Sequence, residues 1–390
     1  MKKFFILFTF IFCFSVFNFS NVYAEESQKY IRVGLVQKFQ AQQSIAIHNK
    51  EIFVGFVING ERSILANRTS PSGFNVSSLG SNIVIKSGEE VLFIFDENIN
   101  PVIWDINENP VKLSSDRSYR GMIEFNQENG GITAINIINV EEYLYSVVSS
   151  EMPPTWHIEA LKAQAVASRS YTHTRIKLDV HSGSMYDICD TTRCQVYNGF
   201  ESETESSREA VSSTRGLMAY FEGEVINATY FSSSGGRTET SAHVWQEALP
   251  YLKSVDDIFE TEGKKWTRTF SLEQIQSTLA NRNIDIGTIQ SIGINKNSTN
   301  RVESLIIIGT NGNHILQKEN IRTFFASFSG GLLESRNFTI TSQTENSVTF
   351  SGQGFGHGVG MSQFGAKGMA EFGFSYQEIL KHYYLGITLE

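Results

Sequence analysis

The feature that most constrains the fold of this chain is a change of sequence periodicity at Pro153-Pro154. Before it, from residue 30 to about residue 106, short runs rich in β-branched and aromatic residues are separated by turn residues such as Pro71-Ser72-Gly73. After it, a stretch to about Ile176 has helical spacing, and its alanines at 160, 163 and 167 share one face. Short strands followed by a long Ala-rich helix predict a mixed α+β fold.

Local signals add detail to this prediction. A hairpin is expected at 122–138, turning at Asn129-Gly130-Gly131, and Thr155 is a candidate N-cap of the long helix. Ser271 and Gln274 have the spacing of a capping box, and 375–382 is expected to form a short helix. We divide the chain into a signal peptide (1–24), a β-rich N-terminal region (25–115) and a larger domain (116–390).

The first 24 residues have the three-part pattern of a secretory signal. Lys2 and Lys3 precede an apolar run, and Val22-Tyr23-Ala24 places small residues at the cleavage positions. A retained anchor is the alternative, but the run is shorter than the roughly 20 residues that a membrane span needs. We therefore expect an extracytoplasmic protein, either secreted or tethered at the membrane, between the membrane and the cell wall.

Composition excludes several classes of protein. The 390 residues are 41% hydrophobic, which is enough for a packed core. The formal net charge of -9 disfavours nucleic acid as a partner, because an acidic chain lacks the positive field that attracts phosphate. Removal of the signal would leave two of the three cysteines, Cys189 and Cys194, which are too few for a disulfide scaffold.

Glu151 is the candidate general acid. The sequence predicts that it ends an apolar strand just before two prolines, beside Met152 and Trp156. Apolar neighbours raise the pKa of a carboxyl group, whereas the start of the following helix would favour its anion, so the net shift stays open. Two structural roles compete with catalysis: Glu151 could cap that helix, or it could pair with an arginine.

Three long motifs resemble the SpoIID/LytB family, that is, stage II sporulation protein D-like lytic transglycosylases. They are Val140–Arg169, which contains Glu151-Met152-Pro153, then Tyr230–Glu239, and then Gly354–Ala366. The resemblance covers about residues 119–390. It implies a β-rich catalytic core with the long helix after the catalytic glutamate, preceded by a small β-rich unit. It also implies cleavage of the MurNAc–GlcNAc β-1,4 bond of peptidoglycan, preferably in strands without stem peptides, with Glu151 as the catalytic residue.

The chemistry of such an enzyme requires only one acid. A hydrolase normally needs two carboxylates, whereas in a lytic transglycosylase the C6 hydroxyl of the muramyl residue replaces water and closes a 1,6-anhydro ring. Glu151 would protonate the glycosidic oxygen and then accept the proton of that hydroxyl. A plain hydrolase, the rival mechanism, would need a second acid such as Asp187 or Asp190. No cofactor is required for catalysis.

The other motif residues are candidates for binding the glycan. The small-residue loop at 232–237 could offer hydroxyls and backbone amides to sugars, or it could be an ordinary turn. Aromatic residues, Trp245 among them, could stack on sugar faces, or they could simply belong to the hydrophobic core. Glycine at every second position of 352–360 would leave one face of a strand without side chains. We interpret His357, within this segment, as a structural histidine and not as an acid-base group. Arg169 is expected to pair with a carboxylate near the cleft. The candidate substrate-binding residues are Trp156, Arg169, Tyr230, Ser232, Ser233, Ser234, Gly235, Gly236, Arg237, His357 and Gln363.

Cys189 and Cys194 have three interpretations. Some SpoIID-like proteins bind zinc near this place through cysteines and histidines, including a histidine just before the second cysteine, where this chain has Arg193. His181 would be a third ligand, and His173 or water a fourth. A disulfide is equally favoured in an exported protein, and two free thiols are the third option.

The resemblance also suggests partners and a second function. Peptidoglycan glycan strands are the expected substrate, and a cell-wall amidase and membrane-associated sporulation proteins are expected neighbours. Because LytB-type relatives modify other autolysins, a non-catalytic, wall-binding amidase enhancer is the main alternative to an enzyme. The acid of the Glu-Met-Pro motif, Glu151, favours the enzyme.

Overall fold

The computed structural model describes residues 30–390 except 59, 97, 246 and 330. The fold is α+β and rich in strands, as predicted. The signal peptide predicted at 1–24 lies outside the described residues. Among the helices that are described, none is long and apolar enough to cross a membrane.

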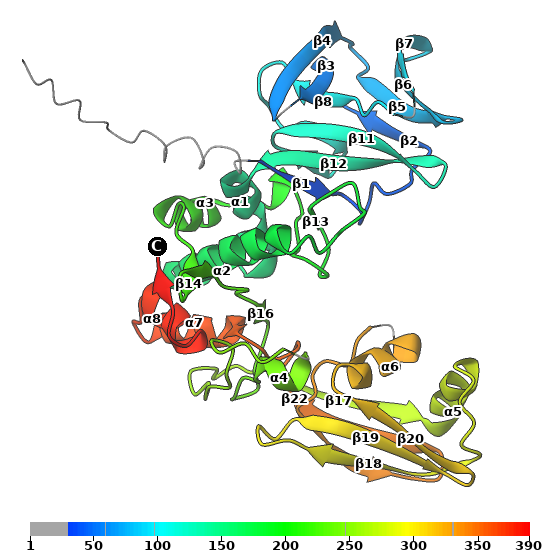
Figure 1. Cartoon of the computed structure of the whole chain (residues 1–390), viewed down its shortest axis with the longest axis vertical. Helices are drawn as coiled ribbons and strands as arrows, with labels where there is room; N and C mark the ends of the chain where they lie inside the picture. Colours follow the sequence, from blue (N-terminus) through cyan, green and yellow to red (C-terminus); the bar gives the residue numbers. More distant parts are fainter. Residues whose placement is uncertain (1–29, 59, 97, 246, 330) are drawn as a thin grey trace, which may run out of the picture.

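The N-terminal half of the fold is built on two sheets, which are antiparallel except for one short strand, and on a small two-stranded ribbon (Figure 1). The larger sheet has seven strands in the order β13-β1-β12-β11-β8-β3-β4. Its strands are β1 (Tyr30–Gly34), β3 (Glu51–Ile58), β4 (Glu61–Thr69), β8 (Val102–Asp105), β11 (Met122–Glu128), β12 (Gly131–Asn139) and the short β13 (Ile188–Cys189), which pairs parallel with β1. The four-stranded sheet is β2 (Ser44–Ile47), β5 (Phe74–Leu79), β6 (Asn82–Ser87) and β7 (Glu90–Phe95), and the ribbon is β9 (Val111–Ser114) with β10 (Arg117–Tyr119).

Strands from both sides of residue 115 share the larger sheet. β1, β3, β4 and β8 precede that position and β11, β12 and β13 follow it, and one hydrophobic core extends from Ile31 to Ile387. The boundary that we predicted at 115/116 lies between β9 and β10, which pair with each other. The β11–β12 hairpin confirms the prediction for 122–138.

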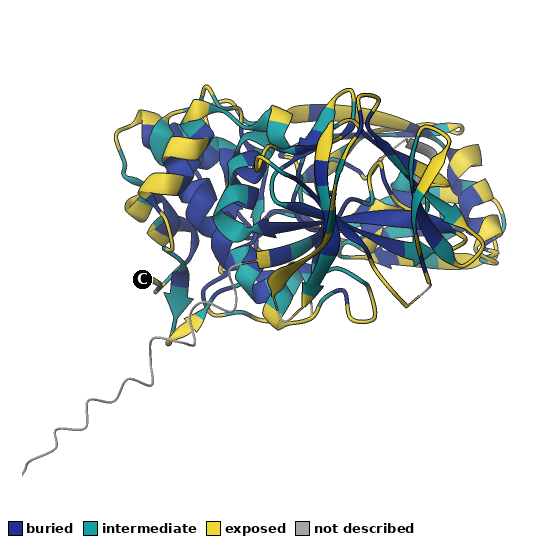
Figure 2. Cartoon of the chain, turned by 90° about the horizontal axis from the view of Figure 1, so that it is seen from above, coloured by how far each residue is buried: buried dark blue, intermediate teal, exposed yellow. Residues whose placement is uncertain are grey.

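A helical layer packs beneath this sheet. Helix α2 (Ile158–Lys177) is its centre and contacts α1 (Val140–Glu151), α3 (Glu205–Ser213), α7 (Gln363–Glu371) and α8 (Tyr376–Tyr383). Its alanines at 160, 163 and 167 are fully buried, so the small face that the sequence predicts lets the neighbouring helices approach closely. In Figure 2, the buried residues (dark blue) run through the interior strands and helices, and the exposed ones (yellow) lie at loops, on outer helix turns and along outer strands such as β4.

Short elements connect this layer. They are the 3₁₀ helix η1 (Phe200–Ser202), the sheet of β14 (Ala219–Phe221), β15 (Glu224–Val225) and β24 (Thr388–Leu389), the pair β16 (Tyr230–Phe231) and β23 (Met361–Ser362), and α4 (Ser241–Val244).

A second unit is inserted between β16 and β23. These two strands pair in parallel, with Tyr230 opposite Met361, although 130 residues separate them in the chain. The inserted unit has its own core around Phe324 and Phe350 and lies apart from the sheets of the N-terminal half (Figure 1). Its elements are β17 (Lys265–Ser271), α5 (Leu272–Asn281), β18 (Ile289–Lys296), β19 (Val302–Gly309), β20 (Gly312–Gln317), α6 (Asn320–Ser329), β21 (Phe338–Gln343) and β22 (Ser347–Gln353).

Helix ends test the local predictions. Both halves of the Ser271–Gln274 capping box are present, as predicted. The short helix predicted at 375–382 is α8, and Ser375 is its N-cap. The N-cap of α2 is His157, not Thr155, because the turn after the two prolines takes up three further residues before the first helical hydrogen bonds form.

Two predictions of strands were wrong. The apolar run before Glu151 is the end of helix α1; its buried residues Tyr143, Leu144, Val147 and Val148 recur at helical spacing. The glycine-alternating segment leaves the strand at Gln353, and Gly354, Gly356, Gly358 and Gly360 then all have positive φ, between 82° and 114°. Alternating left-handed glycines form an irregular loop, so the segment has no bare strand face.

Candidate active site

Glu151 is the last residue of α1. The helix stops there because Pro153 restricts the residue before it, and Met152 accordingly takes an extended conformation with φ -124° and ψ 140°. The negative end of the α1 dipole therefore lies at Glu151 and disfavours its anion. This reverses the effect that we expected from the sequence, in which the positive start of a helix favoured the anion.

Three donors surround the Glu151 carboxyl group. The backbone N–H of Val196 donates to Oε1 at 2.8 Å, Nε2 of Gln363 lies 3.4 Å from Oε2, and the hydroxyl of Tyr230 bonds the same carboxyl group. Among the described residues no arginine, lysine or histidine pairs with it. Burial raises the pKa of Glu151 above its usual value, although the three hydrogen bonds oppose that change. This direction favours the protonated form that a general acid needs.

Tyr230 links Glu151 to the centre of helix α2. Nε2 of Gln195 donates to the Tyr230 hydroxyl at 3.0 Å, and Oε1 of Gln195 accepts from Thr172 of α2 at 2.7 Å. Burial raises the pKa of Tyr230 far above its normal range, so the phenol keeps its proton and can donate it to the carboxyl group of Glu151. This network fixes the orientation of the candidate acid.

Glu151 opens into a cleft of about 960 Å³ between the core and the inserted unit. The core supplies one wall, which includes Tyr171, Arg175, Arg193 and Cys194, and the inserted unit supplies Arg268, Arg322 and Glu334 of the other. Part of the Glu151 side chain stays exposed to this cleft. Of the predicted substrate-binding residues, the cleft is lined by Tyr230, Ser232, His357 and Gln363.

Part of the small-residue loop at 232–237, called the serine-glycine loop, is buried and binds another part of the protein. Glu260 accepts hydrogen bonds from Ser233 Oγ, from the N–H and hydroxyl of Ser234 (both 2.6 Å), from the N–H of Gly235 at 3.2 Å and from Ser362 Oγ at 2.9 Å. Ser233 and Ser234 are buried, so their hydroxyls face this carboxylate instead of the cleft. The loop is folded around Glu260, which explains its small residues.

Four further candidates lie outside the cleft lining. Arg169 is buried and makes a bidentate ion pair with Glu141 at 2.7 and 2.8 Å, away from the cleft. Gly236 and Arg237 are exposed, and Arg237 pairs with Asp256. Trp156 packs edge-on against Phe364, with ring centroids 5.1 Å apart.

His357 lines the cleft as a neutral, hydrogen-bonded side chain. Its Nδ1 accepts from the N–H of Val359 at 3.1 Å, which leaves the proton on Nε2, 3.1 Å from the carbonyl oxygen of Tyr230. Burial and nearby arginines lower the pKa of His357 to about 3. The ring therefore positions β16 and carries no proton to exchange near neutral pH, in agreement with the structural interpretation.

Comparison with known proteins assigns the family. A family model described as Stage II sporulation protein (SpoIID) matches residues 128–221, which include Glu151. Stage II sporulation protein D of Bacillus subtilis (strain 168) is 32% identical over 275 residues, which are 66% of this chain and 76% of the relative. The protein of the same name from Bacillus amyloliquefaciens is 34% identical over 277 residues, 66% of this chain and 75% of the relative.

The chain belongs to the SpoIID family.

Two further matches extend this assignment. The amidase enhancer of Bacillus subtilis (strain 168) is 31% identical over 296 residues, 63% of this chain but only 40% of that relative. A family model described as a domain of unknown function (DUF8618) matches residues 252–360, which include the whole inserted unit. This SpoIID-family chain therefore builds its cleft from two parts, of which only one carries the SpoIID match.

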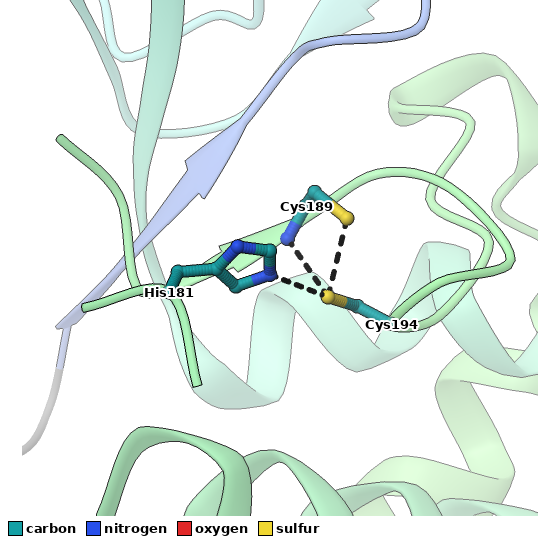
Figure 3. Close-up of side chains that lie close together, drawn as sticks. All are labelled: His181, Cys189 and Cys194. Carbon is teal, nitrogen blue, oxygen red and sulfur yellow. Dashed lines mark hydrogen bonds between the residues drawn. The ribbon is translucent and has the colours of Figure 1, made fainter. Parts of the chain in front are cut away.

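His181, Cys189 and Cys194, the three candidate ligands, converge in this SpoIID-family chain (Figure 3). Their ligand atoms all lie within 4.8 Å of one another and the three residues are buried. Two sulfurs and one imidazole nitrogen fit zinc, which prefers these donors. His173 is not part of the group, and the Arg193 side chain is exposed, so a fourth ligand would come from outside the described side chains. Both cysteines are free thiols in the structure, with their sulfurs 3.2 Å apart.

Sequence reasoning missed several residues of the cleft. Val196 contributes a backbone group, which leaves no trace in the sequence. Arg175 follows Tyr171 by four positions on α2, so the helical spacing alone could have placed the two side chains on the same face of the helix. Phe355 is 43% exposed at the cleft, with the ammonium group of Lys264 4.7 Å from its ring centre. Its place inside the glycine motif was visible, but its exposure was not.

Proposed function

We propose that this protein is an exported lytic transglycosylase that cleaves the MurNAc–GlcNAc β-1,4 bonds of peptidoglycan with Glu151 as its single acid-base group. One observation carries this proposal: Glu151 is held by three hydrogen-bond donors and by no cation among the described residues, has a raised pKa and opens into a cleft of about 960 Å³. An acid that merely capped a helix or closed an ion pair would have neither the free surface nor the raised pKa.

The reaction follows from this geometry. Protonated Glu151 donates its proton to the glycosidic oxygen as the bond from that oxygen to C1 of the muramyl residue breaks. The C6 hydroxyl of the same residue then forms the new bond to C1, and its proton passes to the Glu151 carboxylate. The N–H of Val196 and the hydroxyl of Tyr230 stabilise the carboxylate during its brief life as an anion. Glu151 ends the cycle protonated again.

The positions of the other acids favour this mechanism over hydrolysis. Asp187 accepts from the backbone of Arg32 at 2.8 Å and Asp190 from that of Gln37 at 3.0 Å, and neither is among the described residues that line the cleft. Two other acids do line it: Glu334 is held by Arg268, and Glu247 is exposed. An internal nucleophile removes the need for either of them.

The cleft suits a polymer. An alternating series of rings and ammonium groups extends from Phe355 at the cleft through Lys264, Phe364 and Trp156 to Lys367, with spacings of 4.7 to 5.8 Å. Aromatic faces and hydrogen-bonding ends are what sugar rings contact. This arrangement keeps Trp156 a candidate for binding glycan units outside the cleft. Zinc at His181, Cys189 and Cys194, when bound, would hold in place the segment that carries Val196.

The biological setting is part of the same proposal. The names of the relatives connect this family with sporulation and with the enhancement of an amidase. We infer that the protein acts outside the cytoplasm on cell-wall glycan, beside a cell-wall amidase and membrane-associated sporulation proteins. A non-catalytic enhancer of an amidase is the second candidate, favoured by the match to the amidase enhancer.

Digestion of purified glycan separates these functions. The protein without residues 1–24 would be incubated with peptide-free glycan strands and the new chain ends analysed. A lytic transglycosylase produces 1,6-anhydro-MurNAc ends, and a hydrolase produces reducing ends instead. If neither appears, while an added amidase is accelerated on intact peptidoglycan, the enhancer function replaces our proposal.

A further inference from the structure

Two arginines of the cleft have no acidic partner among the residues that the structure describes. Arg268 and Arg322, on the inserted unit, pair with Glu334 and Glu319. Arg175 and Arg193, on the core wall, line the same cleft, but among the described residues no carboxylate lies within ion-pair distance of either guanidinium. In a chain with a net charge of -9, two unpaired cations on one wall of a cleft require an explanation.

Arg175 is also short of a hydrogen bond. Its Nε is buried and has no partner among the described residues, while its guanidinium lies over the ring of Tyr171, 5.6 Å from the ring centre. A buried N–H without an acceptor is rare in folded proteins because it costs free energy. Arg175 lines the cleft, so a bound ligand would meet the terminal nitrogens of its guanidinium. The fork of an arginine matches the two oxygens of a carboxylate.

The two arginines line the cleft into which Glu151 opens, and Arg175 is connected to Glu151 through Tyr171 and Tyr230. Tyr171 packs against Tyr230, with ring centroids 6.2 Å apart, and Tyr230 bonds Glu151. Neither arginine is among the groups that shift the pKa of Glu151. A ligand anion at Arg175 would thus bind in the same cleft as Glu151.

The substrate class of the proposed function contains one such anion. Each muramyl residue bears a lactyl ether, which ends in an amide when a stem peptide is attached and in a free carboxylate when the peptide has been removed. We propose that Arg175 and Arg193 form a carboxylate subsite that binds the free lactyl group of a muramyl residue. This inference rests on the proposed function. Arg193 stands where the family resemblance led us to expect a histidine, so the subsite is a feature of this chain.

Binding measurements test the subsite apart from catalysis. The Glu151→Gln variant would be titrated with peptide-free glycan strands and with the same strands after their carboxyl groups are converted to methylamides. We expect the amidated strands to bind about tenfold more weakly, which is about 1.4 kcal/mol. On the Glu151→Gln background, Arg193→Gln and Arg175→Gln should each lower this discrimination to threefold or less. Arg193 is exposed, so its replacement leaves the fold intact.

A matched control and kinetics complete the test. Arg215→Gln removes an exposed arginine that does not line the cleft, and should keep the tenfold discrimination. With Glu151 intact, Arg193→Gln should raise KM for peptide-free strands and leave kcat unchanged. Equal binding of both kinds of strand, or discrimination that persists in both arginine variants, would overturn the subsite. If discrimination is found but no 1,6-anhydro ends form, the subsite stands and the transglycosylase proposal fails.

Discussion

The backbone N–H of Val196 lies 2.8 Å from Oε1 of Glu151, although 45 residues separate them. This bond joins the end of helix α1 to the segment that follows Cys194, and it aims the carboxyl group at the cleft. Because the donor is a main-chain group, it neutralises no charge and leaves the pKa of Glu151 raised. A lysine or arginine in its place would hold the carboxyl group as an anion.

Replacing Glu151 with Gln should abolish cleavage. Glutamine keeps the size of the side chain but has no proton to donate, so we expect a loss of about 10³-fold in the rate of formation of 1,6-anhydro ends. The matched control is Glu247→Gln, which removes the exposed acid of the same cleft and should leave the rate within about twofold, because the reaction needs one acid only. A native rate for Glu151→Gln, or an equal loss for Glu247→Gln, would refute the single-acid mechanism.

The same substitution should stabilise the fold at high pH. Burial raises the pKa of Glu151 in the folded protein above its value in the unfolded chain. Its contribution to stability is therefore full below the unfolded pKa and is lost as pH rises through the folded pKa, because ionising the buried group then costs free energy. Glutamine does not ionise. We expect Glu151→Gln to have a higher Tm than the wild type at pH 8 and the same Tm at pH 4. Thermal unfolding at both pH values measures this difference. If the variant gains no Tm at pH 8, the pKa of Glu151 is not raised.

The pH dependence of the rate should move when Tyr230 is changed. The Tyr230 hydroxyl lowers the pKa of Glu151, so Tyr230→Phe should raise that pKa and extend activity to higher pH, while kcat falls by about tenfold because the carboxylate loses a donor. The control is Tyr171→Phe, which removes a hydroxyl from the same cleft that does not bond Glu151. The pH–rate profile is the test. If the fall in rate at high pH occurs at the same pH in Tyr230→Phe as in the wild type, the hydrogen bond from Tyr230 to Glu151 is excluded.

Metal analysis should find about one zinc ion per chain. His181, Cys189 and Cys194 provide three converging donors, and a chelator should lower Tm by several degrees through loss of the ion that links them. Cys194→Ser should bind zinc weakly and show the same low Tm without chelator. Thiol counting on the denatured protein tests the alternatives: no reactive thiols and no zinc would show a disulfide, and two thiols without zinc would show a plain thiol pair.

Glu260 should prove essential to the fold of the serine-glycine loop. Its carboxylate accepts from Ser233, Ser234, Gly235 and Ser362, so Glu260→Ala leaves several buried donors without an acceptor and should lower the free energy of unfolding by about 3 kcal/mol. Glu262→Gln is the control, because that exposed acid makes only a surface ion pair, worth about 0–1 kcal/mol. Urea unfolding measures both, and equal values would exclude this role of Glu260.

Much of the fold could be predicted from local patterns. The hairpin at 122–138, the capping box at Ser271 and the short final helix were correct because their signals lie within a few residues of each other. The end of α1 was misread as a strand because a short apolar run has no unique period. The glycine-rich segment at 354–360 was misread because alternation suits a strand, whereas the observed positive φ values are set by contacts with other segments, such as Arg301 against Gly358.

The sequence by itself determined which residue types carry the chemistry: an acid before two prolines, a small-faced helix and three motifs of one family. Only the tertiary structure decided which of them meet. It turned Arg169 toward Glu141 and the serines toward Glu260, brought the N–H of Val196 to Glu151, and placed Arg175 and Phe355 in the lining of the cleft. The physical reason is that spacing along the chain records the period of a helix or strand, whereas burial and charge pairing depend on contacts between different elements. Arg169 and Glu141 are 28 positions apart, and the paired strands β16 and β23 are more than a hundred positions apart.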